Sequence, residues 1–247
     1  MFKTLANAFK VKDIRNRIIF TFIMLIVVRI GSILPIPGIN RDQLASIFQG
    51  DGSALANAFT GGALLQMSVF ALSITPYITS SIIVQLLTIA IPKLEEMQKD
   101  GEDGRKKIQT ITRFVTVALA LIESIAMVVG FGKSGLIEGY STMAALERVR
   151  VSVMIVAILT AGSTLLMWLG ERITERGVGN GISIILVINI VSRLPEDFVA
   201  LYKSFVKGQS VLNATIAIVV ILAVVVGTIL FTVLLCGGER RSGKRGC

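Results

Sequence analysis

Long apolar runs, separated by short polar segments, constrain the fold of this chain more than any other feature. A helix needs about 20 predominantly apolar residues to cross the hydrocarbon core of a bilayer. Mean hydropathy is +0.76, and 17% of the 247 residues are charged, against about 25% in soluble proteins. We therefore predict an all-α, polytopic membrane helix bundle that forms a single membrane domain over residues 1–247. Its six expected transmembrane spans cover residues 18–34, 68–91, 111–131, 151–169, 182–191 and 211–236.

The stretch from residue 53 to residue 91 differs from a simple span. It begins with small and polar residues, breaks at Gly61 and Gly62, and continues as a long apolar helix that Pro76 interrupts. A broken helix exposes backbone N–H and C=O groups, which are tolerated at membrane depth only inside protein or beside a water-filled cavity. We therefore expect this stretch to line and obstruct a path through the membrane.

The distribution of positive charge predicts the orientation of the chain. Of the 25 Lys and Arg residues, 17 fall on the side of the amino terminus and seven on the opposite side, with Arg29 inside the first span. Cytoplasmic loops carry an excess of Lys and Arg. Both termini are therefore expected in the cytoplasm, residues 1–17 as an amphipathic segment and residues 237–247 as a tail. Since insertion accounts for these charges, the net charge of +9 does not require a nucleic-acid site.

Side chains that support metal, redox or nucleotide chemistry are scarce. The sequence has no His and two Cys, at positions 236 and 247, so we predict no metal, no cofactor and no enzymatic activity. The segment GVGNG at residues 177–181 lacks the preceding strand and the Lys-containing pattern of a phosphate-binding loop. Glu123 lies inside a predicted span, where an acid is a functional hypothesis by default. A position near the interface, or a protonated carboxyl, is an equal alternative for this residue.

Two long motifs go beyond composition. FTGGALLQMSVFALSITPYITSSIIVQLL occupies residues 59–87, and MWLGERITERGVGNGISIIL occupies residues 167–186. Together with PIPG at residues 35–38 and EDGRKKIQ at residues 102–109, they closely resemble SecY, the channel-forming subunit of the bacterial protein translocon. The resemblance implies a passive protein-conducting channel component in the bacterial plasma (inner) membrane. Such a component serves the secretion of preproteins and the insertion of membrane proteins.

The resemblance is to only one half of the family's fold. SecY proteins have ten spans in two inverted halves, whereas six spans and a short re-entrant plug helix are predicted here. The family's pattern continues as far as GERR at residues 238–241, after which SGKRGC departs from it. The expectation is a truncated or half-length SecY that lacks the carboxy-terminal half and cannot close a sealed pore alone.

The resemblance also assigns a pore ring and a plug. The aliphatic constriction of the family falls on Ile74 and Ile78 of the second span and on Ile182 and Leu186 of the fifth. Independently, each pair has the i, i+4 spacing that places two side chains on one helix face. A pore constriction formed by bulky aliphatic side chains favours dewetting. Ordinary helix packing explains the same spacing. The plug would be residues 53–65, hinged at glycines that adopt unusual φ and ψ values; its assigned residues are Ser53, Leu55, Phe59, Gly61 and Gly62.

The second and third spans resemble one side of the family's lateral gate, through which hydrophobic segments reach lipid. Thr79, Gln85 and Glu123 are its polar candidates, although an uncharged residue is expected in the family at the position of Glu123. Basic residues on the cytoplasmic side would dock partners, and topology explains their charge equally well: Arg105, Lys106, Lys107, Arg172, Arg176, Arg240 and Arg241. The implied partners are SecE- and SecG-type subunits, the SecA motor ATPase, the ribosome, signal sequences and nascent polypeptides, membrane lipid, and the missing carboxy-terminal half of SecY.

Two other functions fit the same apolar pattern. A secondary transporter also uses broken helices around a central site, but it would need a polar cluster at the midplane, where Glu123 alone stands out. A non-conducting subunit that associates with an intact translocon would share the motifs without supporting transport. Substrate-dependent uptake would indicate the transporter, and co-purification with the translocon without transport would indicate the associated subunit.

Overall fold

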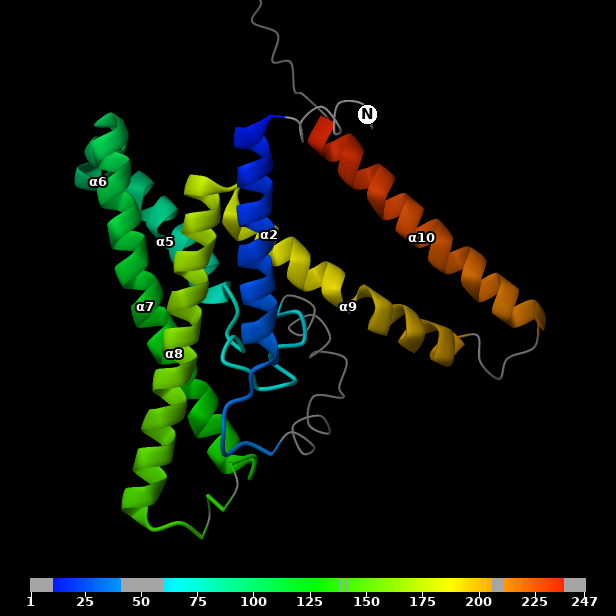
Figure 1. Cartoon of the computed structure of the whole chain (residues 1–247), viewed down its shortest axis with the longest axis horizontal. Helices are drawn as coiled ribbons and strands as arrows, with labels where there is room; N and C mark the ends of the chain where they lie inside the picture. The colour runs from blue at the N-terminus through cyan, green and yellow to red at the C-terminus, as the bar shows by residue number, and fades with distance from the viewer. Residues whose placement is uncertain (1–10, 41–59, 138, 141, 206–210, 238–247) are drawn as a thin grey trace, which may run out of the picture. The chain divides into compact units, whose positions relative to one another are not determined.

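The computed structural model describes residues 11–40, 60–137, 139–140, 142–205 and 211–237. The segment 1–10 and the predicted site residues Ser53, Leu55, Phe59, Arg240 and Arg241 lie outside the described residues. The described chain is helical, with two isolated β-bridges and no strand. It divides into two compact units, Met1–Arg193 and Leu194–Cys247. The helices of Figure 1 are α2 (Lys12–Ile33), α5 (Thr75–Ala90), α6 (Pro92–Lys99), α7 (Gly101–Lys133), α8 (Ala145–Arg176), α9 (Gly181–Phe205) and α10 (Val211–Gly237).

Three described helices are long and apolar enough to cross a membrane, namely α2, α7 and α8. A fourth span is possible if α5 and α6, which meet at a bend of 102°, count as one broken span. The all-α prediction is therefore confirmed, and the apolar helices fit a membrane protein, whereas six spans are not reached by the part of the chain that the structure describes. Helix α10 contains a shorter apolar helix, Val219–Leu235.

The second predicted span begins later than expected. Residues 61–74 form a succession of turns, and the helix starts at Thr75 with Pro76 in its first turn. Proline has no N–H to lose at that position and its φ suits a helix, so it starts α5 and does not interrupt it. Met67 and Ser73 have φ values of 40° and 53° in the turns, which a continuous helix does not allow.

The turn segment is held by backbone hydrogen bonds to the chain that follows α2. The Ile36 N–H donates to the Met67 carbonyl at 2.9 Å, and the Val69 N–H donates to the Leu34 carbonyl at 2.9 Å. Most of its side chains are buried. The apolar composition that predicted a span at residues 68–74 therefore fills the interior of a folded segment.

Three segments predicted as loops are helical. Residues 92–110 form α6 and the beginning of α7, residues 170–176 extend α8, and residues 192–205 extend α9 through Pro195. In α6, Lys99 donates a 2.6 Å hydrogen bond to Glu95 one turn earlier, a pairing that supports isolated helices. The same hydrogen bond lowers the pKa of the Glu95 carboxyl.

Small polar residues join the helices inside unit Met1–Arg193. Helix α7 packs against α5, α6 and α8, and α2 packs against α8 (Figure 1). The hydroxyls of Ser80 in α5 and Thr116 in α7 share a 2.5 Å hydrogen bond, and Ser124 in α7 bonds Thr160 in α8 at 3.0 Å. Such hydrogen bonds and close contacts hold helices together where lipid removes the hydrophobic driving force.

Candidate functional site: a cavity between four helices

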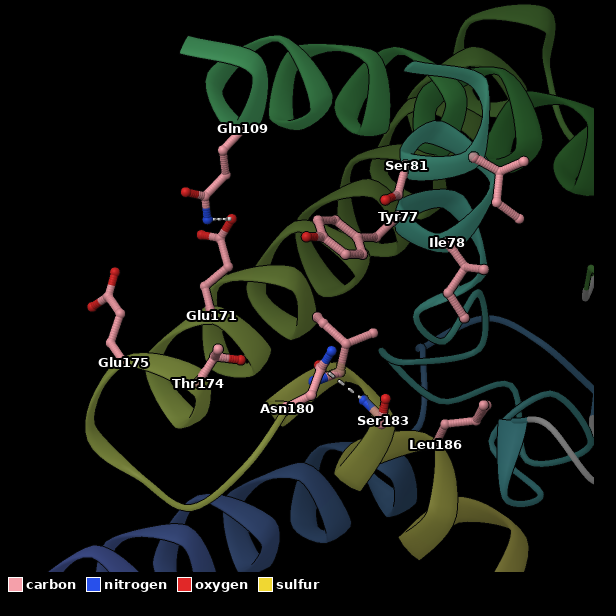
Figure 2. A pocket seen from close by; sticks show the side chains of 12 residues that line it. Tyr77, Ile78, Ser81, Gln109, Glu171, Thr174, Glu175, Asn180, Ser183 and Leu186 are labelled. Atoms are coloured by element: carbon pink, nitrogen blue, oxygen red, sulfur yellow. Dashed lines mark hydrogen bonds between the residues drawn. The ribbon is translucent and has the colours of Figure 1, made fainter. Parts of the chain in front are cut away.

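A cavity of about 570 Å³ lies between α5, α7, α8 and the start of α9 (Figure 2). Its wall combines aliphatic side chains with hydroxyl, amide and carboxylate groups. Both charged residues in the wall, Glu171 and Glu175, come from α8. The lining residues are Tyr77, Ile78, Ser81, Ile82, Gln109, Glu171, Thr174, Glu175, Asn180, Ile182, Ser183 and Leu186.

Three of the four predicted pore-ring residues meet at this cavity. Ile78 comes from α5, and Ile182 and Leu186 come from α9, with i, i+4 spacing along that helix. Ile74 is not among the lining residues: it is 1% exposed and belongs to the core cluster that contains Ile185. Ile74 is the N-cap of α5, and its carbonyl accepts a hydrogen bond from the Ile78 N–H at 3.1 Å. Ile78 and Ile182 pack against the same core cluster. The role of the ring stays a prediction.

The position of α9 depends on Asn180. The Asn180 side-chain oxygen accepts hydrogen bonds from the N–H groups of Ile182 at 3.1 Å and Ser183 at 3.4 Å. These are the otherwise unpaired N–H groups at the start of a helix, and asparagine is among the best residues for capping them. The cap fixes the first turn of α9, which carries Ile182 into the cavity.

The glycines of GVGNG allow two chain segments to approach closely. A Cβ atom at Gly181 would lie 2.1 Å from the Gly170 carbonyl, and one at Gly177 would lie 2.5 Å from the Thr21 hydroxyl. Gly179 has a φ of +69°, in the left-handed region that glycine adopts without strain. The motif is therefore a tight connection between α8 and α9.

Two hydroxyl groups fasten this connection to its neighbours. The Thr174 hydroxyl donates to the Gly170 carbonyl and accepts from the Gly181 N–H, both at 2.9 Å. The Thr21 hydroxyl of α2 accepts from the Val178 N–H at 3.2 Å. The wall of the cavity is thus tied both to the end of α8 and to α2.

Glu171 is the buried carboxylate of the cavity wall, and it joins α8 to α7. Its side chain is 7% exposed, and one oxygen, Oε1, accepts from Arg113 Nε at 2.9 Å and from Gln109 Nε2 at 3.1 Å. Gln109 and Arg113 stand one turn apart on α7. A carboxylate removed from water is costly unless it is paired, so this pairing is what permits Glu171 to lie there. Sequence reasoning missed it; the available signal was one acid and one base at the polar ends of two apolar helices.

The predicted gate residues are not gathered into one cluster. Thr79 is exposed on α5, Glu123 is half-buried on α7, and Gln85 lines a separate cavity of about 180 Å³ together with Arg105. The buried polar contact between α5 and α7 is the Ser80–Thr116 hydroxyl pair. Ser80 was not among the residues that the resemblance assigned, and the gate role of Thr79 stays a prediction.

The predicted docking residues that are described lie at the polar ends of α7 and α8. Arg105, Lys106 and Lys107 are exposed near the start of α7, and Arg176 is exposed at the end of α8. The Arg113–Glu171 ion pair places those two ends together. Arg172 bonds Glu175 at 2.9 Å and lies 5.5 Å from the centre of the Trp168 ring.

The predicted hinge glycines have the expected backbone. Gly61 and Gly62 have φ values of +64° and +82°. A Cβ atom at Gly61 would lie 3.1 Å from Asn189 in α9, and one at Gly62 would lie 3.2 Å from the Arg193 side chain. The glycines therefore begin the turn segment while passing close to α9. Their role as a hinge stays a prediction.

Comparison with known proteins gives consistent matches. The SecY family model matches residues 68–241. Protein translocase subunit SecY of Bacillus subtilis is 44% identical over 238 residues, which is 93% of this chain and 54% of the relative. The subunit of the same name from Pseudomonas aeruginosa is 45% identical over 228 residues, 91% of this chain and 49% of the relative. The chain thus spans about half the length of the curated relatives it matches.

Proposed function

Because the chain belongs to the SecY family, we propose that it is a protein-conducting channel component for the secretion of preproteins and the insertion of membrane proteins. The observation that carries the proposal is the convergence of Ile78, Ile182 and Leu186 from two helices on one cavity. Aliphatic side chains offer no ligands for ions and shed water, so they can restrict leakage and still deform around a passing polypeptide.

The polar parts of the cavity suit an aqueous path that continues from this restriction. Tyr77, Ser81, Asn180 and Ser183 supply hydroxyl and amide groups beside the aliphatic side chains (Figure 2). A passing chain exposes its own backbone N–H and C=O groups, which need water or polar partners at membrane depth. In the proposal these residues form part of the cytoplasmic approach, and residues 53–65, hinged at Gly61 and Gly62, form the plug.

The proposed gate and docking functions belong to different surfaces. The lateral gate would use the α5 and α7 side of the molecule, including Thr79, Gln85 and Glu123. The polar ends of α7 and α8 would dock the SecA motor ATPase or the ribosome through basic residues such as Arg105 and Arg176, which can meet acidic protein or phosphate. SecE- and SecG-type subunits, signal sequences and the other half of a SecY would complete the assembly, with both termini in the cytoplasm of a bacterial cell.

Complementation tests this proposal directly. The chain is expressed in translocon-depleted cells together with the part of a SecY relative that it does not cover, and export of a secreted reporter is measured. We expect export to be restored by the pair and by neither part alone. A stably inserted pair that fails to export the reporter would contradict the proposal, and co-purification with intact translocon without export would indicate a non-conducting subunit.

A further inference from the structure

We propose that the Arg113–Glu171 ion pair closes a side passage between the inner cavity and a groove on the outside of the α7–α8 pair. The inference concerns the wall of the cavity and holds whatever passes through it. Three hollow regions follow one another across α8.

The outermost region is an apolar groove of about 750 Å³ between α7 and α8, lined by exposed side chains such as Leu121 and Val153. A second hollow of about 320 Å³ adjoins it and shares Thr164 and Trp168 with it. This second hollow shares Glu171 and Glu175 with the inner cavity. The two glutamates are therefore what separates the inner cavity from the outer regions.

The hydrogen-bond partners of Glu171 lie on opposite sides of this boundary. Gln109 lines the inner cavity, whereas Arg113 lines the second hollow. Both donate to the same oxygen of Glu171, at 3.1 and 2.9 Å. The Glu171 carboxylate of α8 thus lies between the inner cavity and the second hollow. Two side chains of α7 hold it there, one from each of these regions.

Glu175 is less able to hold the boundary. Its partner, Arg172, comes from the same helix three residues earlier, and the two side chains are 51% and 37% exposed. An exposed pair within one helix contributes little and joins no second element. Glu171 is 7% exposed and joins two helices. We therefore assign the closing of the side passage to Glu171, with Glu175 lying over it.

Trp168 makes the closure measurable. It is the one tryptophan in the sequence, and it lines both outer regions. In liposomes, quenching of its fluorescence by brominated phospholipid and by acrylamide in the aqueous phase reports how far lipid and water reach its 46% exposed side chain. Glu171→Ala should raise acrylamide quenching of Trp168 by about twofold and shift its emission to the red, because water fills a polar hollow that has lost its partner.

Three further variants of the full chain keep the test decisive. Glu147→Ala, an exposed acid in the first turn of α8, is the matched control and should leave the spectrum unchanged. Glu171→Gln keeps an acceptor for both donors and should give an intermediate increase. Arg113→Glu combined with Glu171→Arg should return quenching towards that of the unaltered chain.

Circular dichroism distinguishes opening of the passage from unfolding. If Glu171→Ala loses helix content, Glu171→Gln and the exchanged pair decide the matter. Helical Glu171→Ala and Glu171→Gln proteins whose Trp168 emission and acrylamide quenching match the unaltered chain would overturn the inference. Export is not measured in this experiment, so its result is separate from the complementation test of the proposed function.

Discussion

Single polar atoms set the position of whole helices in this protein. The side-chain oxygen of Asn180 accepts the first N–H groups of α9, and one oxygen of Glu171 holds two side chains of α7. Neither residue draws attention in the sequence, because asparagine between glycines and glutamate beside arginine are both common at polar helix ends. Their importance comes from partners that only the folded chain supplies; Arg113 precedes Glu171 by 58 residues.

Replacement of Asn180 tests the cap of α9. Asn180→Ala should lower the stability of the protein by about 1 kcal/mol, the usual cost of removing a capping side chain. Asn180→Asp is the matched control, because aspartate caps as well as asparagine does. Thermal unfolding in detergent, followed by circular dichroism, measures both. An aspartate variant as unstable as the alanine variant would mean that the amide, and not the acceptor oxygen, matters.

Two glycines in helices offer a direct comparison of close packing. A Cβ atom at Gly162 of α8 would lie 2.0 Å from the Val69 carbonyl of the turn segment, whereas at Gly130 of α7 nothing lies within 4 Å. Gly162→Ala should therefore destabilise the protein by about 1–3 kcal/mol through overpacking.

Gly130→Ala should not lower the stability of the protein as Gly162→Ala does. Gly130→Ala should be neutral or stabilising by up to about 1 kcal/mol, because alanine favours a helix. Unfolding temperatures of the two variants, compared with the unaltered chain, measure the difference. Equal effects of the two substitutions would contradict the close approach of α8 to the turn segment.

At the scale of elements, hydropathy located helices better than it located their ends. The apolar runs of α2, α7 and α8 were predicted in place, but each helix extends beyond its run. An apolar run marks the part of a helix suited to hydrocarbon, whereas the helix ends where its backbone hydrogen bonds end. Residues 68–74 were wrongly assigned to a span for the converse reason, since side chains buried inside turns are as apolar as those in a span.

The contact between α5 and α7 can be measured as a coupling energy. Ser80→Ala, Thr116→Val and the double variant form a cycle in which the shared hydrogen bond should contribute about 0.5–1.5 kcal/mol. Thr79→Ala is the control, because Thr79 is adjacent in sequence and exposed, and it should show no coupling to Thr116. The free energy of unfolding in detergent is measured for the unaltered chain, the two single variants and the double variant. Additive effects of Ser80→Ala and Thr116→Val would show that the hydroxyl pair does not join the helices.

For the whole molecule, part of the candidate site was predictable and part was not. Family motifs identified Ile78, Ile182 and Leu186, which the fold brings to one cavity. Ile74 has the same chemistry and spacing, and it lies in the core cluster against which Ile78 and Ile182 pack. Spacing places Ile74 one turn before Ile78 but does not show how deeply each side chain is buried, so the place of Ile74 in the ring stays a prediction.

The proposed restriction predicts a specific leak. In the chain assembled with the part of a SecY relative that it does not cover, Ile78→Gly should widen the aliphatic neck and raise ion conductance across a planar bilayer. Ile83→Gly is matched in residue type and helix, but the exposed Ile83 side chain does not line the cavity. Both changes have a similar helix-propensity cost of about 0.5 kcal/mol. Conductance that rises equally in both variants, or in neither, would contradict the assignment of Ile78.

The 102° bend between α5 and α6 has a mechanical consequence. Eight residues of helix make α6 a rigid arm about 12 Å long, set nearly crosswise to α5. A force along the axis of α6 therefore acts on the end of α5 nearly at a right angle to the axis of α5. A ligand that binds α6 therefore acts on a helix that meets α5 at the single residue Ile91 and also packs against α7.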